Sequence, residues 1–162
     1  MKTLKIAFIG HRKVTQKNEL KKKLKKVIYT LINEEDAEIF LFGGKGQFDE
    51  VSLAAVTELK QKYFPLIERI YVRAIYEQIT DDYKSFLLLF YDKTFYPKEV
   101  KEARYFSYVK RNEVMIDMCD ILITYYDKNY PSLTGLKSGT KAAVEYAIKK
   151  HKRIINLFEY EQ

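Results

Sequence analysis

The chain has 162 residues, of which 47% are hydrophobic, so its length and composition favour one domain with a substantial core over a disordered chain. The formal net charge of +7 favours anionic partners, but much of the excess lies in the lysine runs at residues 21–23 and 25–26, which we interpret as the solvated face of a helix. The lone cysteine excludes an internal disulfide, and no signal-like opening or membrane-length apolar run is present, so we expect a soluble cytoplasmic protein without a membrane partner.

Two short apolar runs in the first half, residues 4–9 and 38–42, predict buried strands. A helical pattern follows each of them, because hydrophobic residues recur on one side of the segments at 20–32 and 51–59. Thr15 is the candidate N-cap of the first helix.

The turns after these strands carry groups suited to a ligand. The first turn reads Gly-His-Arg, and the second is a glycine cluster that a carboxylate follows. Glycine lets a backbone approach an anion closely, whereas a carboxylate suits a ribose hydroxyl, a base edge or a general base. The candidate binding residues here are Gly10, His11, Arg12, Gly43, Gly44, Gly46 and Asp49. Simple turn roles for His11 and Arg12 stay open.

The second half predicts three further strands at residues 67–74, 121–125 and 153–158. A helix that begins at the capping residues Thr80-Asp81-Asp82 is expected to run through Phe90, and residues 91–108 are aromatic and irregular. They could form a pocket wall or pack loosely over the sheet edge. Cys119, just before a strand, is expected to be a buried thiol, and the loop from residue 127 to 137 is long enough to form a binding wall.

Strands and helices therefore alternate about five times. This pattern predicts an α/β fold in which residues 1–162 form a single Rossmann-like, three-layer domain, with a mostly parallel sheet of about five strands and helices on both faces. Right-handed crossovers bring the strand-to-helix loops to the carboxyl edge of the sheet, so the three glycine-bearing loops are expected to share one rim.

The last of these loops precedes a helix of small residues. Ser138, Gly139 and Thr140 stand at its start, where backbone N–H groups favour an anion and a hydroxyl side chain caps the helix or contacts phosphate. Arg111, on the preceding helix, is a candidate for phosphate pairing or catalysis, although a surface ion pair with a nearby carboxylate would also explain it.

Four motifs resemble those of the SLOG superfamily, and the similarity covers nearly the whole chain. They are Phe-Ile-Gly-His-Arg at 8–12, Phe-Gly-Gly-Lys-Gly-Gln-Phe-Asp at 42–49, Arg-Asn-Glu-Val-Met-Ile-Asp at 111–117 and Ser-Gly-Thr-Lys-Ala-Ala-Val-Glu-Tyr-Ala at 138–147. That superfamily includes the YpsA/YoqJ-like bacterial and prophage proteins, which the chain resembles most, together with DprA and the LOG phosphoribohydrolases. The resemblance implies a Rossmann-like sheet and a site for nucleotides or nucleotide-derived ligands.

By the same resemblance, Arg111 matches the catalytic arginine of the LOG enzymes and Glu145 is the candidate acid. Three departures separate the chain from them. Asn112 replaces the usual lysine, Gly135-Leu136-Lys137 stands where a double glycine is usual, and Glu145 follows Thr140 by five residues instead of about three. Because a catalyst must lie within about 3 Å of its proton, these departures favour binding over hydrolysis.

Three functions follow for testing. The first is a binding protein for a nucleotide or an ADP-ribose-like signal, a sensor or sequestering protein of the kind that related domains supply in phage defence. The alternatives are a LOG-like phosphoribohydrolase or N-glycosidase that uses Arg111 with Glu145 or Asp49, and a DprA-like protein associated with single-stranded DNA. We expect a small-molecule partner, a homodimer by analogy, no metal and no cofactor, and we regard nucleic acid as the less favoured partner.

Overall fold

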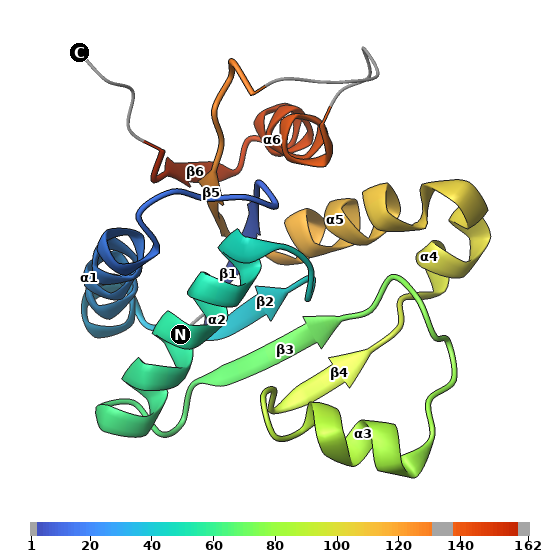
Figure 1. Cartoon of the computed structure of the whole chain (residues 1–162), viewed down its shortest axis with the longest axis horizontal. Coiled ribbons are helices and arrows are strands. Elements are labelled where there is room, and N and C mark those ends of the chain that lie inside the picture. Colours follow the sequence, from blue (N-terminus) through green and yellow to red (C-terminus); the bar gives the residue numbers. More distant parts are fainter. Residues whose placement is uncertain (1–2, 131–137, 159–162) are drawn as a thin grey trace.

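Within residues 3–130 and 138–158, which the computed structural model describes, six parallel strands form one sheet (Figure 1). The strands are β1 (Leu4–Gly10), β2 (Ala37–Phe42), β3 (Glu68–Val72), β4 (Lys93–Phe95), β5 (Ile121–Tyr125) and β6 (Arg153–Asn156). The α/β, Rossmann-like prediction is therefore confirmed, with one strand more than expected. The additional strand is β4, which lies at the edge of the sheet within the segment that the sequence left irregular.

The helices connect these strands in the expected alternation. They are α1 (Lys17–Glu35), α2 (Gln47–Lys62), α3 (Asp81–Leu87), α4 (Lys98–Ala103), the short 3₁₀ helix η1 (Arg104–Phe106), α5 (Ser107–Met118) and α6 (Gly139–Lys149). The side chain of Thr80 caps α3 as predicted, because its Oγ1 accepts a hydrogen bond from the backbone N–H of Tyr83 at 3.1 Å.

The predicted cap of α1 is wrong. Gln16, not Thr15, occupies the N-cap position, where it has a left-handed backbone with φ of 51° and makes no side-chain cap hydrogen bond. The hydroxyl of Thr15 lies 3.3 Å from the hydroxyl of Tyr125, at the end of β5. The Thr15 hydroxyl therefore contacts Tyr125, which is distant in sequence, instead of capping α1.

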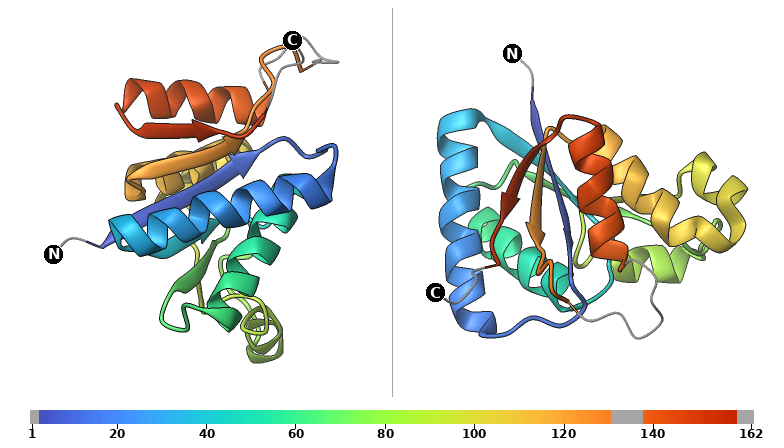
Figure 2. Two further views of the ribbon diagram at one scale, coloured as in Figure 1. Left: turned by 90° about the vertical axis from the view of Figure 1, so that its left-hand side faces the viewer. Right: turned by 90° about the horizontal axis from the view of Figure 1, so that it is seen from above.

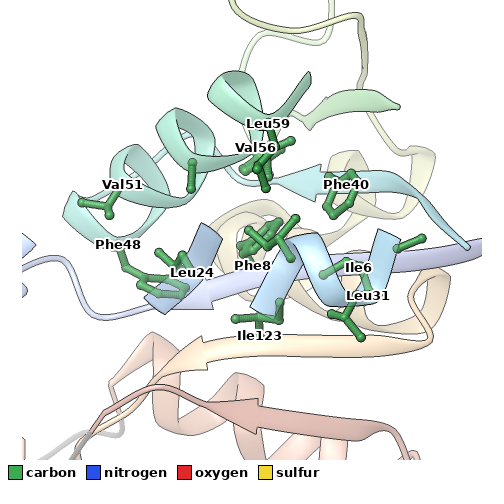
Figure 3. Close-up of a cluster of buried hydrophobic side chains, with 14 of the residues drawn as sticks. Ile6, Phe8, Leu24, Leu31, Phe40, Phe48, Val51, Val56, Leu59 and Ile123 are labelled. Atoms are coloured by element: carbon green, nitrogen blue, oxygen red, sulfur yellow. The ribbon is translucent and has the colours of Figure 1, made fainter. Parts of the chain in front are cut away.

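One face of the sheet packs against α1 and α2 (Figure 2). Figure 3 shows side chains of both helices meeting those of the central strands. Phe8 stacks on Phe42 with ring centroids 5.0 Å apart, and Leu24 and Val56 are fully buried against this layer. Each such side chain stabilises the fold by about 1.5–3 kcal/mol, so this cluster fixes the sheet that carries the loops.

The opposite face packs against α5 and α6 (Figure 1). Small residues face the sheet there, and Ala143 and Ala147 let α6 lie close to it. Cys119, at the end of α5, is buried as predicted, and burial raises the pKa of its thiol to about 12.

The order of the strands is β4-β3-β2-β1-β5-β6, so the chain reverses direction across the sheet between β1 and β5. Register aligns the strand ends at this place, since Phe8 pairs with Phe42 and Gly10 pairs with Tyr125. A crevice outside the carboxyl ends of the strands is expected at such a reversal. Among the described helices, none has the length and apolar character needed to cross a membrane.

Candidate functional site

A cleft of about 350 Å³ opens at this reversal, at the carboxyl edge of the sheet. Parts of β1, the β2–α2 loop, α5 and the start of α6 line it, so segments far apart in sequence meet there. The predicted residues that line the cleft are Gly10, His11, Arg12, Gly43, Asp49, Arg111, Ser138, Gly139 and Thr140. The three glycine-bearing loops therefore share one rim, as the topology predicted.

Arg111 lines the cleft and is buried, with only 4% of its surface exposed. Its Nη1 donates to the carbonyl oxygen of Gly43 at 2.6 Å and to that of Val72 at 3.2 Å, and its Nε donates to Asn112 at 3.0 Å. This geometry excludes a surface ion pair. No described residue accepts a hydrogen bond from Nη2, which leaves two donors for a ligand in the cleft.

Gly43 is held from both sides. Its carbonyl accepts from Arg111, and its N–H donates to Oδ1 of Asp49 at 3.1 Å. A Cβ on Gly43 would lie 2.8 Å from Cζ of Arg111, so a larger residue there would displace the guanidinium group. The arginine and the aspartate therefore clamp the β2–α2 loop while both line the cleft.

Asp49 lies in the first turn of α2 and is 7% exposed. Burial raises the pKa of its carboxyl to about 7, although hydrogen bonds from the N–H groups of Gly44 and Gly43 and the charge of Arg111 oppose this rise. Asp49 therefore exchanges a proton near neutral pH inside the cleft, and both of its forms are available to a ligand.

The two other glycines of the cluster, Gly44 and Gly46, do not line the cleft. Gly46 has φ of 94°, and a Cβ there would lie 3.0 Å from Cα of Arg12. Gly44 also has positive φ and packs against the ring of Tyr71. Backbone conformation and close packing explain both glycines, so neither is needed as a direct ligand contact.

His11 ties the end of β1 to the loop after β5. Its Nε2 accepts a hydrogen bond from the N–H of Asp127 at 2.9 Å, and its ring stacks on Tyr130 with centroids 3.9 Å apart. Burial lowers the pKa of His11, and an accepting Nε2 places the proton of the neutral ring on Nδ1. His11 thus fixes one wall of the cleft as well as lining it.

The start of α6 supplies backbone donors. Ser138 is the N-cap, and its Oγ accepts from the N–H of Lys141 at 3.0 Å. Gly139 and Thr140 are the first two residues of α6, so their backbone N–H groups have no hydrogen-bond acceptor within the helix. A Cβ at Gly139 would meet no atom within 4 Å, which means that this point borders open space.

Two further cations and two aromatic rings also line the cleft. Arg12 and Lys45 are exposed, and the Nζ of Lys45 lies 3.9 Å from the ring centroid of Tyr108. Tyr130, which stacks on His11, also lines the cleft. The cleft therefore combines positive charge with flat apolar surfaces.

Glu145 is not among these residues. It is exposed and lines a separate hollow between α5 and α6. The acid in the cleft is Asp49 instead. Residues 135–137, which depart from the LOG loop, lie outside the described residues. Among the described residues, no cluster of three or more His, Cys, Asp or Glu side chains could hold a metal ion.

The sequence did not single out six residues that line the cleft, and two of these, Phe8 and Ile9, are core residues of β1. Lys45 stands inside the glycine cluster and Asn112 follows Arg111, so their positions could have indicated them. Tyr108 precedes Arg111 by three residues, which is the spacing of one helical face. Tyr130 lies in the loop at 127–137 that was expected to form a binding wall, but nothing in the sequence marked this residue itself, since its place depends on stacking with His11.

Comparison with known proteins assigns the fold but not the family. No protein-family model and no curated protein matches the chain. Two solved structures are similar to it over 94% of its length. One is the protein TM1055, determined by a structural genomics consortium, at 13% identity, a TM-score of 0.59 and 72% coverage of that chain. The other is the molybdenum cofactor carrier protein MCP from Chlamydomonas reinhardtii, at 18% identity, a TM-score of 0.57 and 75% coverage. The chain shares their Rossmann-like fold.

Proposed function

We propose that the cleft binds a nucleotide or a nucleotide-derived phosphorylated molecule and that the protein belongs to the SLOG superfamily. The observation that carries this proposal is the meeting of a buried arginine, free helix-end amides and two exposed cations at the strand reversal. Ligands of Rossmann-like sheets bind at this place. A ligand that combines a negative charge with a planar ring matches a cleft lined by cations and tyrosine rings.

The phosphate fits between α6 and Arg111. The amides of Gly139 and Thr140 point along the helix axis, where the helix dipole favours negative charge. Nη2 of Arg111 supplies charge-assisted hydrogen bonds from a buried position. These groups are held by the fold before the ligand arrives, so little side-chain ordering is required on binding.

The nucleoside part fits the remaining walls. Asp49 would accept a hydrogen bond from a ribose hydroxyl or a base when ionised, and would donate one when protonated. The rings of Tyr108 and Tyr130 offer faces for stacking of a base. Of the two similar structures, one is described as a cofactor carrier, which supports binding without turnover as a use of this fold.

Calorimetry with AMP tests the proposal. We expect one-site binding that weakens by about two- to fivefold in Lys45→Ala, because an exposed cation contributes less than about 1 kcal/mol. Lys13→Ala removes an exposed lysine that does not line the cleft and should leave the affinity unchanged. Mass spectrometry of the purified protein should show a carried phosphorylated molecule. Absence of AMP binding together with absence of any carried nucleotide would overturn the proposal.

Turnover is the second candidate, because Asp49 places a proton-exchanging group beside Arg111. In that case Asp49, not Glu145, would act as the acid or base in cleavage of an N-glycosidic bond. Incubation with AMP followed by chromatography checks this. Release of free adenine that Asp49→Asn abolishes would support the enzyme, and intact AMP after long incubation would support the binding protein.

A further inference from the structure

A separate hollow of about 800 Å³ lies beyond the carboxyl ends of β3 and β4, beside α4, and none of its lining residues lines the cleft. Figure 1 shows α4 at this end of the two strands. The volume is within the range of ligand pockets, about 300–1,000 Å³. Four of the side chains that line this α4 hollow are cations, namely Arg73, Lys98, Lys101 and Arg104.

Arg73 is the buried cation of the α4 hollow, with 6% of its surface exposed. Its Nε and Nη2 donate to the carbonyl oxygens of Tyr76 and Glu77, at 3.2 and 3.3 Å, and its Nη1 donates to Oγ1 of Thr94 at 3.0 Å. All three acceptors are uncharged, and no described carboxylate pairs with Arg73. Each terminal nitrogen therefore keeps one N–H for an acceptor from outside the described chain.

The buried arginines of the described chain differ in their partners. There are three, Arg69, Arg73 and Arg111. Arg69, which lines neither the cleft nor the α4 hollow, binds both carboxylate oxygens of Asp92, with Nε 3.1 Å from Oδ2. Arg73 and Arg111 donate only to uncharged oxygens, and each of them lines a hollow. Because a buried charge is costly without a counter-ion, the hollow beside Arg73 is a place for an anion from solution.

Two exposed cations line the same hollow. Lys98 is the first residue of α4 and Arg104 directly follows this helix, and the side chain of neither pairs with a described residue. Lys101 is neutralised by Glu77 at 3.0 Å, which leaves Glu102 as the unpaired carboxylate. Unpaired positive charge therefore exceeds unpaired negative charge in the hollow.

A phosphoryl group matches this arrangement better than a carboxylate. It carries up to two negative charges on three terminal oxygens that point in different directions. Two of these oxygens can accept the remaining N–H groups of a guanidinium, while the third faces a cation on another side. A carboxylate offers one charge and two oxygens in a single plane.

We propose that the α4 hollow binds a small phosphorylated molecule, with Arg73 as the buried anchor and Lys98 and Arg104 as the flanking cations. This site is additional to the cleft, and it does not depend on what the cleft binds.

Calorimetry with inorganic pyrophosphate tests the proposal in the Gly139→Val background, where the new side chain occupies the anion position of the cleft. We expect one-site binding in this background. Replacing Lys98 and Arg104 together by glutamine should weaken it by about tenfold, since an exposed cation contributes up to about fivefold. Arg73→Gln should weaken it by at least about tenfold, because charge-assisted hydrogen bonds are lost. Lys84→Gln, which replaces an exposed lysine of α3 outside the hollow, is the matched control and should bind normally.

The double variant decides the test, because it removes only exposed charges, whereas Arg73 also holds the turn at Tyr76 and Glu77. Citrate, a polyanion of carboxylates, checks the chemical class and should bind more weakly than pyrophosphate. Absence of pyrophosphate binding, binding that the double variant leaves unchanged, or citrate binding as tight as that of pyrophosphate would each overturn the proposal. None of these outcomes concerns AMP binding by the wild type, so the proposed function of the cleft stands or fails separately.

Discussion

At the scale of single residues, Arg111 serves the fold and the cleft with different atoms. Nη1 and Nε bind Gly43, Val72 and Asn112, which joins α5 to the ends of β2 and β3. Nη2 remains for a ligand. The side chain that would hold the phosphate therefore also holds the loop that forms part of the cleft, and its removal should affect both properties.

Arg111→Ala should lower the free energy of unfolding by about 1–3 kcal/mol, because it leaves buried carbonyl acceptors without their donor. It should also weaken AMP binding by about 1.5–3 kcal/mol if Nη2 pairs with the phosphate. Urea unfolding and calorimetry measure the two effects. Arg153→Ala, which removes an exposed ion pair with Glu35 at 2.7 Å, should cost less than about 1 kcal/mol and leave binding intact. Undiminished AMP binding by Arg111→Ala would remove the arginine from the site.

Gly139→Val should abolish AMP binding while the melting temperature stays nearly unchanged. The Cβ of the new side chain has no neighbouring atom within 4 Å, and the side chain would occupy the space over the helix-end amides. A stability change within about 0.5 kcal/mol is expected for an exposed position. Thermal unfolding and calorimetry check the two parts, with Gly139→Ala as an intermediate case. Wild-type affinity in the valine variant would show that the phosphate does not bind at α6.

Asp49→Asn should change how stability depends on pH. The pKa of Asp49, raised to about 7 in the folded protein, exceeds its unfolded value of 3.8, so its contribution to stability is complete below pH 4 and is lost as pH rises through 7. Asparagine does not titrate, and its oxygen can still accept from Gly43. The free energy of unfolding of the variant minus that of the wild type should therefore rise between about pH 4 and 7 and level off above pH 7. Urea unfolding at several pH values measures it, and a flat or falling difference would contradict the raised pKa.

At the scale of elements, the sequence pattern predicted a strand correctly where all of its side chains are buried. The run Ile121–Tyr125 was predicted with its observed bounds, because all five side chains are buried. β4 was missed since it has three residues at the sheet edge, none of them fully buried, and so gives no apolar run. The buried state of Arg111 was also missed, because its carbonyl partners lie 68 and 39 residues away in the chain.

The cap of α6 provides a test at this scale. Ser138→Ala should cost about 0.5–2 kcal/mol of stability and should also weaken AMP binding, because fraying of the first turn of α6 misplaces the amides. Thr80→Ala removes the same kind of cap from α3, away from the cleft, and should lower stability without affecting binding. Thermal unfolding and calorimetry of the two variants separate the effects. Equal binding losses would mean that the cap of α6 acts only through global stability.

At the scale of the whole molecule, two of the places where positive charge gathers bear on ligand binding. One is the cleft, and the other is the outer face of α1, where lysines and Tyr29 surround a larger hollow of about 730 Å³. On the α1 face, Lys21 and Lys25 both bind the carboxylate of Glu58, at 2.6 and 3.1 Å. Size alone therefore does not mark the ligand site, since that hollow lacks the buried arginine and the free helix-end amides.

This distribution bears on the nucleic-acid alternative. A DNA-binding surface needs several cations that reach successive phosphates, and its affinity falls steeply with salt concentration. Glu58 neutralises part of the α1 face, and the cations of the cleft line a single hollow of about 350 Å³. We therefore expect a single-stranded oligonucleotide to show little retention near physiological salt in a mobility-shift or anisotropy assay. Retention that weakens steeply with salt and disappears when Lys22, Lys23 and Lys26 are replaced by alanine would instead make α1 a nucleic-acid surface.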